Sequence, residues 1–124
     1  MRRALSRLLQ PELVAKPILP VADLAEAVEF YRSLGFRVTA YDAGYAWVYE
    51  GEREFMHLRH VAGLDTTANA ASVYLHVQDA DVWFARIAAA LGDAVTAVAD
   101  MPWEMREFSF TDPFGNLVRV GQNL

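Results

Sequence analysis

Apolar side chains recur at helical spacing over one stretch near the start of the chain. Between residues 24 and 34 they lie three or four positions apart, which places them on one face of a helix. They are Leu24, Ala27, Val28, Tyr31 and Leu34. Asp23 and Glu26 have the spacing of a helix-capping box, and Gly35 suits a helix end in a left-handed conformation. The pattern predicts a helix that begins after Asp23 and ends near Gly35.

On both sides of this helix, apolar and polar residues alternate as they do in half-buried strands. One strand is predicted before the helix, at residues 17–21. Three more are predicted after it, at residues 36–41, 45–49 and 55–59, with turn residues between them. The order of elements is therefore strand, helix and three strands, or βαβββ.

The chain contains a weak internal repeat of this order. Val21-Ala22-Asp23 recurs as Val77-Gln78-Asp79, an offset of 56 residues (77 minus 21). Leu34-Gly35 recurs as Leu91-Gly92, at an offset of 57 that one inserted residue explains. A second βαβββ unit is therefore expected in the second half of the chain.

The repeat sets the boundaries of the second unit and of the parts around it. Its strands are predicted at residues 72–77, near 95–99, at 106–111 and at 117–121. Its helix is predicted at residues 79–91, with Trp83, Ile87, Ala90 and Leu91 facing inward. We divide the chain into an arm at 1–15, a first module at 16–61, a linker at 62–71 and a second module at 72–122.

One helix covers only one face of a four-stranded sheet, so each module leaves an open sheet face. We expect an α+β fold in which two curved mixed sheets turn these faces toward one another or toward a second chain and form a cleft. A unit of about 60 residues buries too little surface to be stable alone. A homodimer is therefore expected.

Composition narrows the classes of partner. The chain has 124 residues and no cysteine, which excludes disulfides, thiolate metal sites and thiol chemistry and suits a reducing cytoplasm. No apolar run approaches the ~20 residues of a membrane span. Residues 17–124 hold 7 basic and 15 acidic side chains, a net charge of −8. We therefore expect no nucleic-acid or membrane partner, and a cationic small molecule is favoured.

Several motifs point to a known family. The paired βαβββ order, with Asp112-Pro113-Phe114-Gly115-Asn116 before the last strand, resembles the vicinal oxygen chelate superfamily of glyoxalases, extradiol dioxygenases and antibiotic resistance proteins. Residues 27–31 with Leu34-Gly35-Phe36, and residues 102–108, look most like the bleomycin resistance proteins. The resemblance covers residues 16–122. It implies a dimer that sequesters the drug in clefts at its interface, without chemical change.

Enzymes of the superfamily place metal ligands in the first and last strands of each module. The matching positions here are Lys16, His57, Ser72 and Arg119. Lysine and arginine are donor-only cations, and one hydroxyl plus one imidazole falls short of the usual three ligands. We therefore expect no metal site, no cofactor and no enzymatic activity.

Two alternatives remain open at this point. One is a metal-dependent enzyme, glyoxalase-like or dioxygenase-like, with displaced ligands drawn from His57, His76 and Glu107. The other is a binding module for an endogenous metabolite.

Candidate ligand-binding residues come from the resemblance and from strand alternation. The resemblance makes Trp103 and Tyr45 stacking platforms and Asp42 an acidic turn residue. Alternation places other polar and aromatic side chains on the same strand faces. The predicted set is Trp103, Tyr45, Trp47, Asp42, His57, Tyr74, Ser72 and Arg119. No catalytic residue is expected among them.

Overall fold

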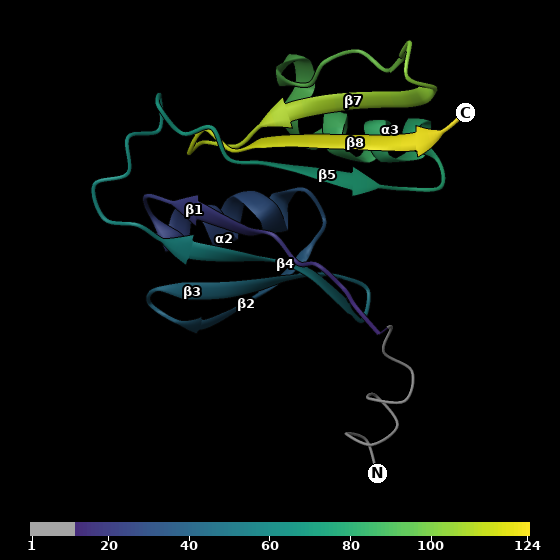
Figure 1. The fold of residues 1–124 in the computed structure, drawn as a ribbon. Helices are drawn as coiled ribbons and strands as arrows, with labels where there is room; N and C mark the ends of the chain where they lie inside the picture. Colours follow the sequence, from purple (N-terminus) through teal and green to yellow (C-terminus); the bar gives the residue numbers. More distant parts are fainter. Residues whose placement is uncertain (1–11) are drawn as a thin grey trace.

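The computed structural model describes residues 12–124, so residues 1–11 of the predicted arm lie outside the described part. Both predicted βαβββ units are present (Figure 1). The first module contains β1 (Ile18–Val21), α2 (Leu24–Ser33), β2 (Arg37–Asp42), β3 (Tyr45–Glu50) and β4 (Arg53–His60). The second contains β5 (Ser72–His76), α3 (Ala80–Leu91), the short 3-10 helix η1 (Gly92–Ala94), β6 (Ala99–Asp100), β7 (Met105–Thr111) and β8 (Leu117–Asn123).

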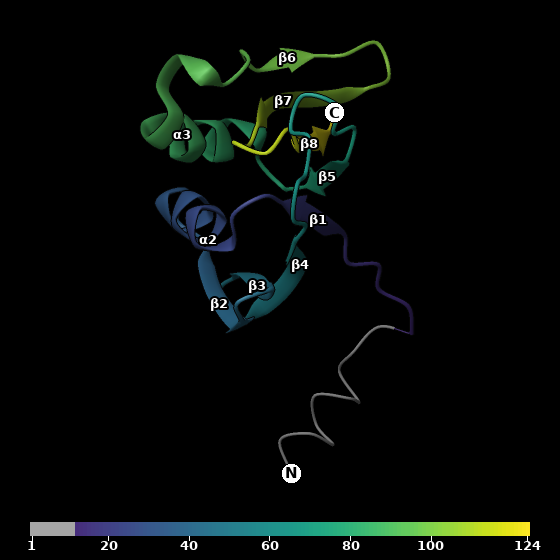
Figure 2. The same cartoon turned by 90° about the vertical axis from the view of Figure 1, so that its left-hand side faces the viewer.

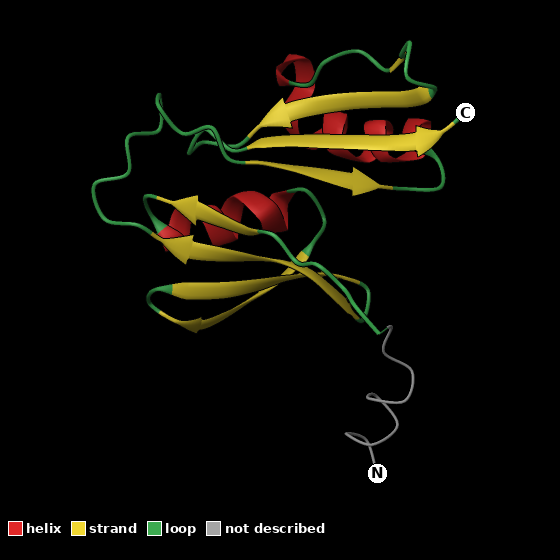
Figure 3. Cartoon of the chain, viewed as in Figure 1, coloured by secondary structure: helices red, strands yellow, loops and turns green. Residues whose placement is uncertain are grey.

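Each module forms one four-stranded mixed sheet. The strand orders are β1-β4-β3-β2 and β5-β8-β7-β6. In each sheet the first strand runs parallel to the last, and the other neighbours are antiparallel. One helix packs beside each sheet (Figure 3), and Figure 2 shows both helices on the same side of the molecule. The predicted α+β fold with two mixed sheets is confirmed.

The helices begin where the sequence predicts. The Asp23 side chain accepts a hydrogen bond from the Glu26 N–H at 3.0 Å, and Asp79 caps α3 in the same way. All five residues of the predicted stripe on α2 are buried. On α3, Ile87 is buried as predicted, but the inward placement of Ala90 is wrong because Ala90 is exposed. The buried face of α3 is centred on Ala80 and Ile87, and Ala90 lies beyond its edge.

The second module departs from prediction in its shortest strand. Residues 95–99 were expected to form a strand, but only Ala99–Asp100 pairs regularly with β7, and Val95 makes one isolated bridge to Phe110. The Thr96 hydroxyl accepts a hydrogen bond from the Ser109 N–H at 2.8 Å. Because this side chain takes a donor that a strand backbone would use, regular pairing is interrupted there.

A buried hydrogen-bond cluster joins the two modules. The Tyr31 hydroxyl, on α2, donates to Asp112 Oδ2 at 2.6 Å in the turn before β8. Asp112 also accepts from the Phe114 and Asn116 backbone N–H groups and from the Asn116 side chain. The Asn116 amide in turn donates to the Pro20 carbonyl in β1 at 2.8 Å. The Asp-Pro-Phe-Gly-Asn segment is therefore both a turn and the link between the modules.

A second link lies just beyond the C-terminus of α2. Arg86 on α3 donates to the Leu34 carbonyl and forms a two-pronged ion pair with Glu50 at 2.7 and 3.0 Å. Its guanidinium also lies over the rings of Phe36 and Trp83. Trp83 thus packs in the core between the modules, as its helical spacing indicates.

Within residues 12–124, no helix is both long enough and apolar enough to cross a membrane.

Removing the Tyr31 hydroxyl tests the link between the modules. We expect Tyr31→Phe to lower the free energy of unfolding by about 1.5–3 kcal/mol, because a buried carboxylate loses a donor. Denaturant unfolding followed by circular dichroism measures this change. Tyr41→Phe is the control, because Tyr41 is 69% exposed and its change should stay within about 0.5 kcal/mol. Equal effects of the two substitutions would contradict a special role for the link.

Candidate functional site

The eight predicted site residues divide between the two sheets. Tyr45 and Trp47 lie on β3 and His57 on β4, all in the first sheet. Tyr74 lies on β5 and Arg119 on β8 in the second sheet, with Trp103 in the loop before β7. Within one chain the structure therefore forms two separate groups, each on an open sheet face.

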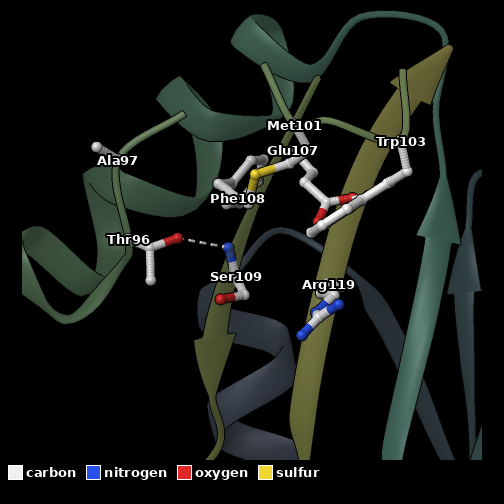
Figure 4. A pocket seen from close by; sticks show the side chains of 8 residues that line it. All are labelled: Thr96, Ala97, Met101, Trp103, Glu107, Phe108, Ser109 and Arg119. Carbon is white, nitrogen blue, oxygen red and sulfur yellow. Dashed lines mark hydrogen bonds between the residues drawn. The ribbon is translucent and has the colours of Figure 1, made fainter. Parts of the chain in front are cut away.

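The second-module group is organised around Glu107, on β7. Its side chain is 3% exposed, and its Oε2 accepts hydrogen bonds from the Tyr74 hydroxyl at 2.8 Å and from the Trp103 indole N–H at 3.3 Å. Figure 4 shows the carboxylate beside the Trp103 indole, with Arg119 on the neighbouring strand. A buried carboxylate is thus held by two neutral donors that come from different segments.

The second carboxylate oxygen of Glu107, Oε1, differs from Oε2 in its surroundings. Among residues 12–124, Glu107 Oε1 has no hydrogen-bond donor and no Lys or Arg nitrogen lies within 4.0 Å of the carboxylate. In the same part of the chain, every fully buried side-chain polar atom has a partner. Oε1 therefore retains contact with solvent and is available to a ligand.

A cavity of about 190 Å³ opens beside this carboxylate. Its lining is Thr96, Ala97, Met101, Trp103, Glu107, Phe108, Ser109 and Arg119. Sites that enclose a drug-sized molecule usually measure about 300–1,000 Å³. The cavity beside Glu107 can therefore hold only part of such a ligand.

The position of the Tyr74 hydroxyl depends on Gly121 in β8. A Cβ atom on Gly121 would collide with that hydroxyl, so only glycine allows Tyr74 to reach Glu107. Burial, the hydrogen bond to Glu107 and the negative charge of Glu107 raise the pKa of Tyr74 from 10.0 to about 12, and Arg119 opposes this shift. The phenol is therefore a neutral donor at physiological pH.

The first-module group is a chain of four polar side chains. The Tyr45 hydroxyl lies 2.5 Å from His57 Nδ1, and His57 Nε2 donates to Glu54. Lys16 forms an ion pair with the same carboxylate, with 3.4 Å between Nζ and Oε2. Partial burial raises the pKa of the Glu54 carboxyl, but the hydrogen bond from His57 and the nearby Lys16 together outweigh burial and lower it. Glu54 is therefore an anion at neutral pH.

Aromatic side chains flank this polar chain. Trp47 lies directly across from His57 in the pairing of β3 with β4. The Tyr41 ring meets the Trp47 ring edge-on at 5.5 Å between centroids, and 69% of Tyr41 is exposed. The first sheet thus presents exposed aromatic surface beside its hydrogen-bonding groups.

Two predicted residues lie apart from these groups. The Asp42 carboxylate accepts a hydrogen bond from the Gly44 N–H at 2.8 Å and lines a different groove, beside the start of α2. Ser72 is exposed at the start of β5, opposite Leu117 in the strand pairing. The structure therefore places neither side chain beside Glu107 or His57.

Sequence reasoning missed the two carboxylates that organise the site. Glu107 appeared only as a displaced metal ligand, and Glu54 was not singled out. Strand alternation could have found Glu107. On β7, Phe108 and Phe110 are buried, so the side chain of the preceding Glu107 points to the opposite, open face of the sheet. No local signal reveals that Glu54 joins Lys16 to His57.

The displaced-ligand set is not brought together within one chain. His57 lies in the first sheet, whereas His76 and Glu107 lie on β5 and β7 of the second. In the described part of the chain, no three His, Asp or Glu side chains are grouped so that they could hold a metal ion.

A protein-family model matches residues 12–120, and its description is the glyoxalase/bleomycin resistance protein/dioxygenase superfamily. The chain belongs to this superfamily. The match covers both modules, so the resemblance seen in the sequence is confirmed. A search of curated proteins finds no match.

Solved structures that resemble this superfamily member include antibiotic-binding proteins. A bleomycin-binding protein in complex with bleomycin is 26% identical, with a TM-score of 0.79, over 89% of this chain and 98% of that chain. The bleomycin-binding protein of bleomycin-producing Streptomyces verticillus, in complex with copper(II)-bleomycin, is 27% identical, with a TM-score of 0.72, over 90% and 97%. TnmS3, an antibiotic binding protein from Streptomyces sp. CB03234, is 25% identical, with a TM-score of 0.69, over 93% and 100%.

The pKa of Tyr74 provides a test of the Glu107 cluster. We expect this phenol to ionise near pH 12, so the stability that the cluster gives is complete below pH 10.0 and is lost as the pH rises through about 12. In Glu107→Gln the Tyr74 pKa should fall toward 10.0, because one carboxylate charge is gone while burial remains. Phenolate absorbance, assigned by subtraction of Tyr74→Phe, measures both values. An unchanged pKa in Glu107→Gln would show that Glu107 does not control Tyr74.

Proposed function

We propose that the protein is a non-enzymatic binding protein that sequesters a planar, cationic antibiotic of the bleomycin type. The observation that carries this proposal is the buried Glu107 carboxylate beside Trp103, with one oxygen open to the cavity. The three antibiotic-binding structures that resemble the chain support the same class of ligand.

The chemistry of the cavity favours a cation. A carboxylate that is 3% exposed loses most of its hydration, and the two neutral donors on Oε2 do not balance its charge. An ammonium or guanidinium group on the ligand would supply that charge at Oε1. The exposed Trp103 indole offers a flat surface for an aromatic ring or a cation.

Arg119 indicates that the ligand also carries a hydrogen-bond acceptor. It lines the same cavity and forms no ion pair within 4.0 Å with any carboxylate among residues 12–124. Its guanidinium can therefore donate to a carbonyl or another acceptor. A ligand with a cationic group and nearby acceptors, such as a peptide-like antibiotic, satisfies both Glu107 and Arg119.

The proposal includes a homodimer, in which the first-module group of one chain faces the second-module group of its partner. The cavity beside Glu107 is small, and large aromatic side chains stay exposed in both modules, with Trp103 at 55% and Tyr41 at 69%. A second copy would cover this surface and complete two equivalent clefts.

Titration with metal-free bleomycin tests this function. We expect EDTA-treated protein to bind it at micromolar or tighter affinity (about −8 kcal/mol or better), measured by isothermal titration calorimetry. Glu107→Gln and Trp103→Ala should each weaken binding about tenfold or more, because they remove the anion and the stacking surface. The drug should emerge chemically unchanged.

Glu52→Gln is the control, because Glu52 is an exposed turn residue between β3 and β4 and should leave the affinity unchanged. Circular dichroism of each variant verifies that the fold is kept, and sedimentation measures the oligomeric state. An affinity for bleomycin that is unchanged in both Glu107→Gln and Trp103→Ala would overturn the proposed site. Conversion of the drug or a requirement for metal would favour an enzyme, and binding of an aromatic metabolite alone would favour a metabolite module.

A further inference from the structure

The cavity beside Glu107 is bordered by two opposite charges that are not paired with each other. Glu107 lies on β7 and Arg119 on the neighbouring strand β8, and both side chains line the cavity. Within residues 12–124, no nitrogen of Arg119 lies within 4.0 Å of any carboxylate oxygen, those of Glu107 included. An anion and a cation therefore face the same space without neutralising each other directly.

The register of β7 with β8 explains why the two charges stay apart. Arg119 pairs across from Ser109, whereas Glu107 pairs across from Gly121. Glu107 and Arg119 are therefore diagonal neighbours on the same face of the sheet, at positions about 7–8 Å apart. Figure 4 shows both side chains, together with Ser109, at the wall of the cavity. A small ligand can thus contact both charged groups at once.

The balance of charge in this cavity favours a ligand that carries both signs. A ligand with only a cation at Glu107 Oε1 would place it near the like charge of Arg119. A ligand with only an anion at Arg119 would place it near the like charge of Glu107. A molecule that holds an ammonium and a carboxylate group a few bonds apart meets an opposite charge at each end.

The rest of the lining and the volume limit the size of this ligand. Ala97, Met101 and the ring of Trp103 provide apolar surface, and 55% of Trp103 is exposed. The volume of about 190 Å³ is below the range of about 300–1,000 Å³ that is usual for drug-sized ligands. The cavity therefore suits a small molecule with a short apolar side chain.

We propose that this cavity is a subsite for a zwitterion of the α-amino acid type. The ammonium group binds Glu107 Oε1, the carboxylate binds the Arg119 guanidinium, and the short apolar side chain packs against Met101 and the Trp103 ring. This inference deepens the proposed function and rests on its ligand site. In a larger antibiotic, the part of the molecule at this cavity would be an amino-acid-like unit.

The subsite is tested with three ligands that differ in charge, namely L-leucine, L-leucine methyl ester and N-acetyl-L-leucine. They are titrated into the EDTA-treated protein in mildly acidic buffer, in which both free amines are protonated. The NMR signal of the Trp103 indole N–H, which donates to Glu107, reports binding and is assigned by its loss in Trp103→Phe. We expect L-leucine to bind about fivefold or more tightly than the ester, which lacks the anion, and than the N-acetyl compound, which lacks the cation.

Two substitutions assign each preference to one side chain. Arg119→Gln should abolish the preference for L-leucine over the ester, and Glu107→Gln should abolish the preference over the N-acetyl compound. Arg53→Gln is the matched control, because Arg53 is an exposed arginine at the start of β4, and it should keep both preferences. Circular dichroism verifies the fold of each variant, and Arg119 is itself exposed, so its substitution leaves the core unchanged.

Each outcome decides the proposal. Failure of L-leucine to bind, or equal affinities of the unaltered protein for the three ligands, would overturn it. A preference that persists in the variant assigned to it would remove that contact and, with it, the zwitterion. A protein that shows both charge preferences but binds no bleomycin loses the proposed function and keeps this subsite. A protein that binds bleomycin through Glu107 but does not bind L-leucine keeps the function and loses this inference.

Discussion

The buried hydrogen bond between Tyr31 and Asp112 is the constraint on which the arrangement of the two modules depends. Asp112 lies in a turn of the second module, and Tyr31 lies on the helix of the first. Burial, together with the charge of Asp112 and the hydrogen bond to it, raises the pKa of Tyr31 well above its ordinary value. The phenol therefore remains a donor, and the Asp112 carboxylate, which already accepts three hydrogen bonds within its own module, gains its fourth donor only when the modules are docked.

This link also sets the direction of the open sheet faces. Asn116, which donates to Asp112 and to the Pro20 carbonyl, ties the beginning of β8 to β1. The two parallel pairs, β1 with β4 and β5 with β8, are thereby fixed relative to each other. Because His57 is on β4 and Arg119 is on β8, the same buried cluster that stabilises the core determines where the candidate ligand groups lie.

The two open faces use charge in different ways. In the second sheet, the buried Glu107 carboxylate accepts from two neutral donors, and no Lys or Arg nitrogen of residues 12–124 lies within 4.0 Å of it. In the first sheet, Lys16 and His57 both contact Glu54, so that carboxylate has its partners within the chain. The resemblance to the superfamily matches Lys16 and His57 with positions that carry metal ligands in its enzymes. In this chain those positions belong to an internal ion pair and hydrogen-bond chain.

The sequence by itself determined the order of elements, the capped start of both helices and the buried stripe of α2, because period, propensity and capping act over a few residues. The tertiary structure decided the short β6, where the Thr96 side chain takes the Ser109 N–H. It also decided the environment of Glu107, because its two hydrogen-bond donors, Tyr74 and Trp103, come from another strand and from a loop. Gly121 leaves the space that the Tyr74 hydroxyl occupies. Alternation indicates only which face a residue occupies; strand register and packing between segments distant in sequence decide which groups meet there.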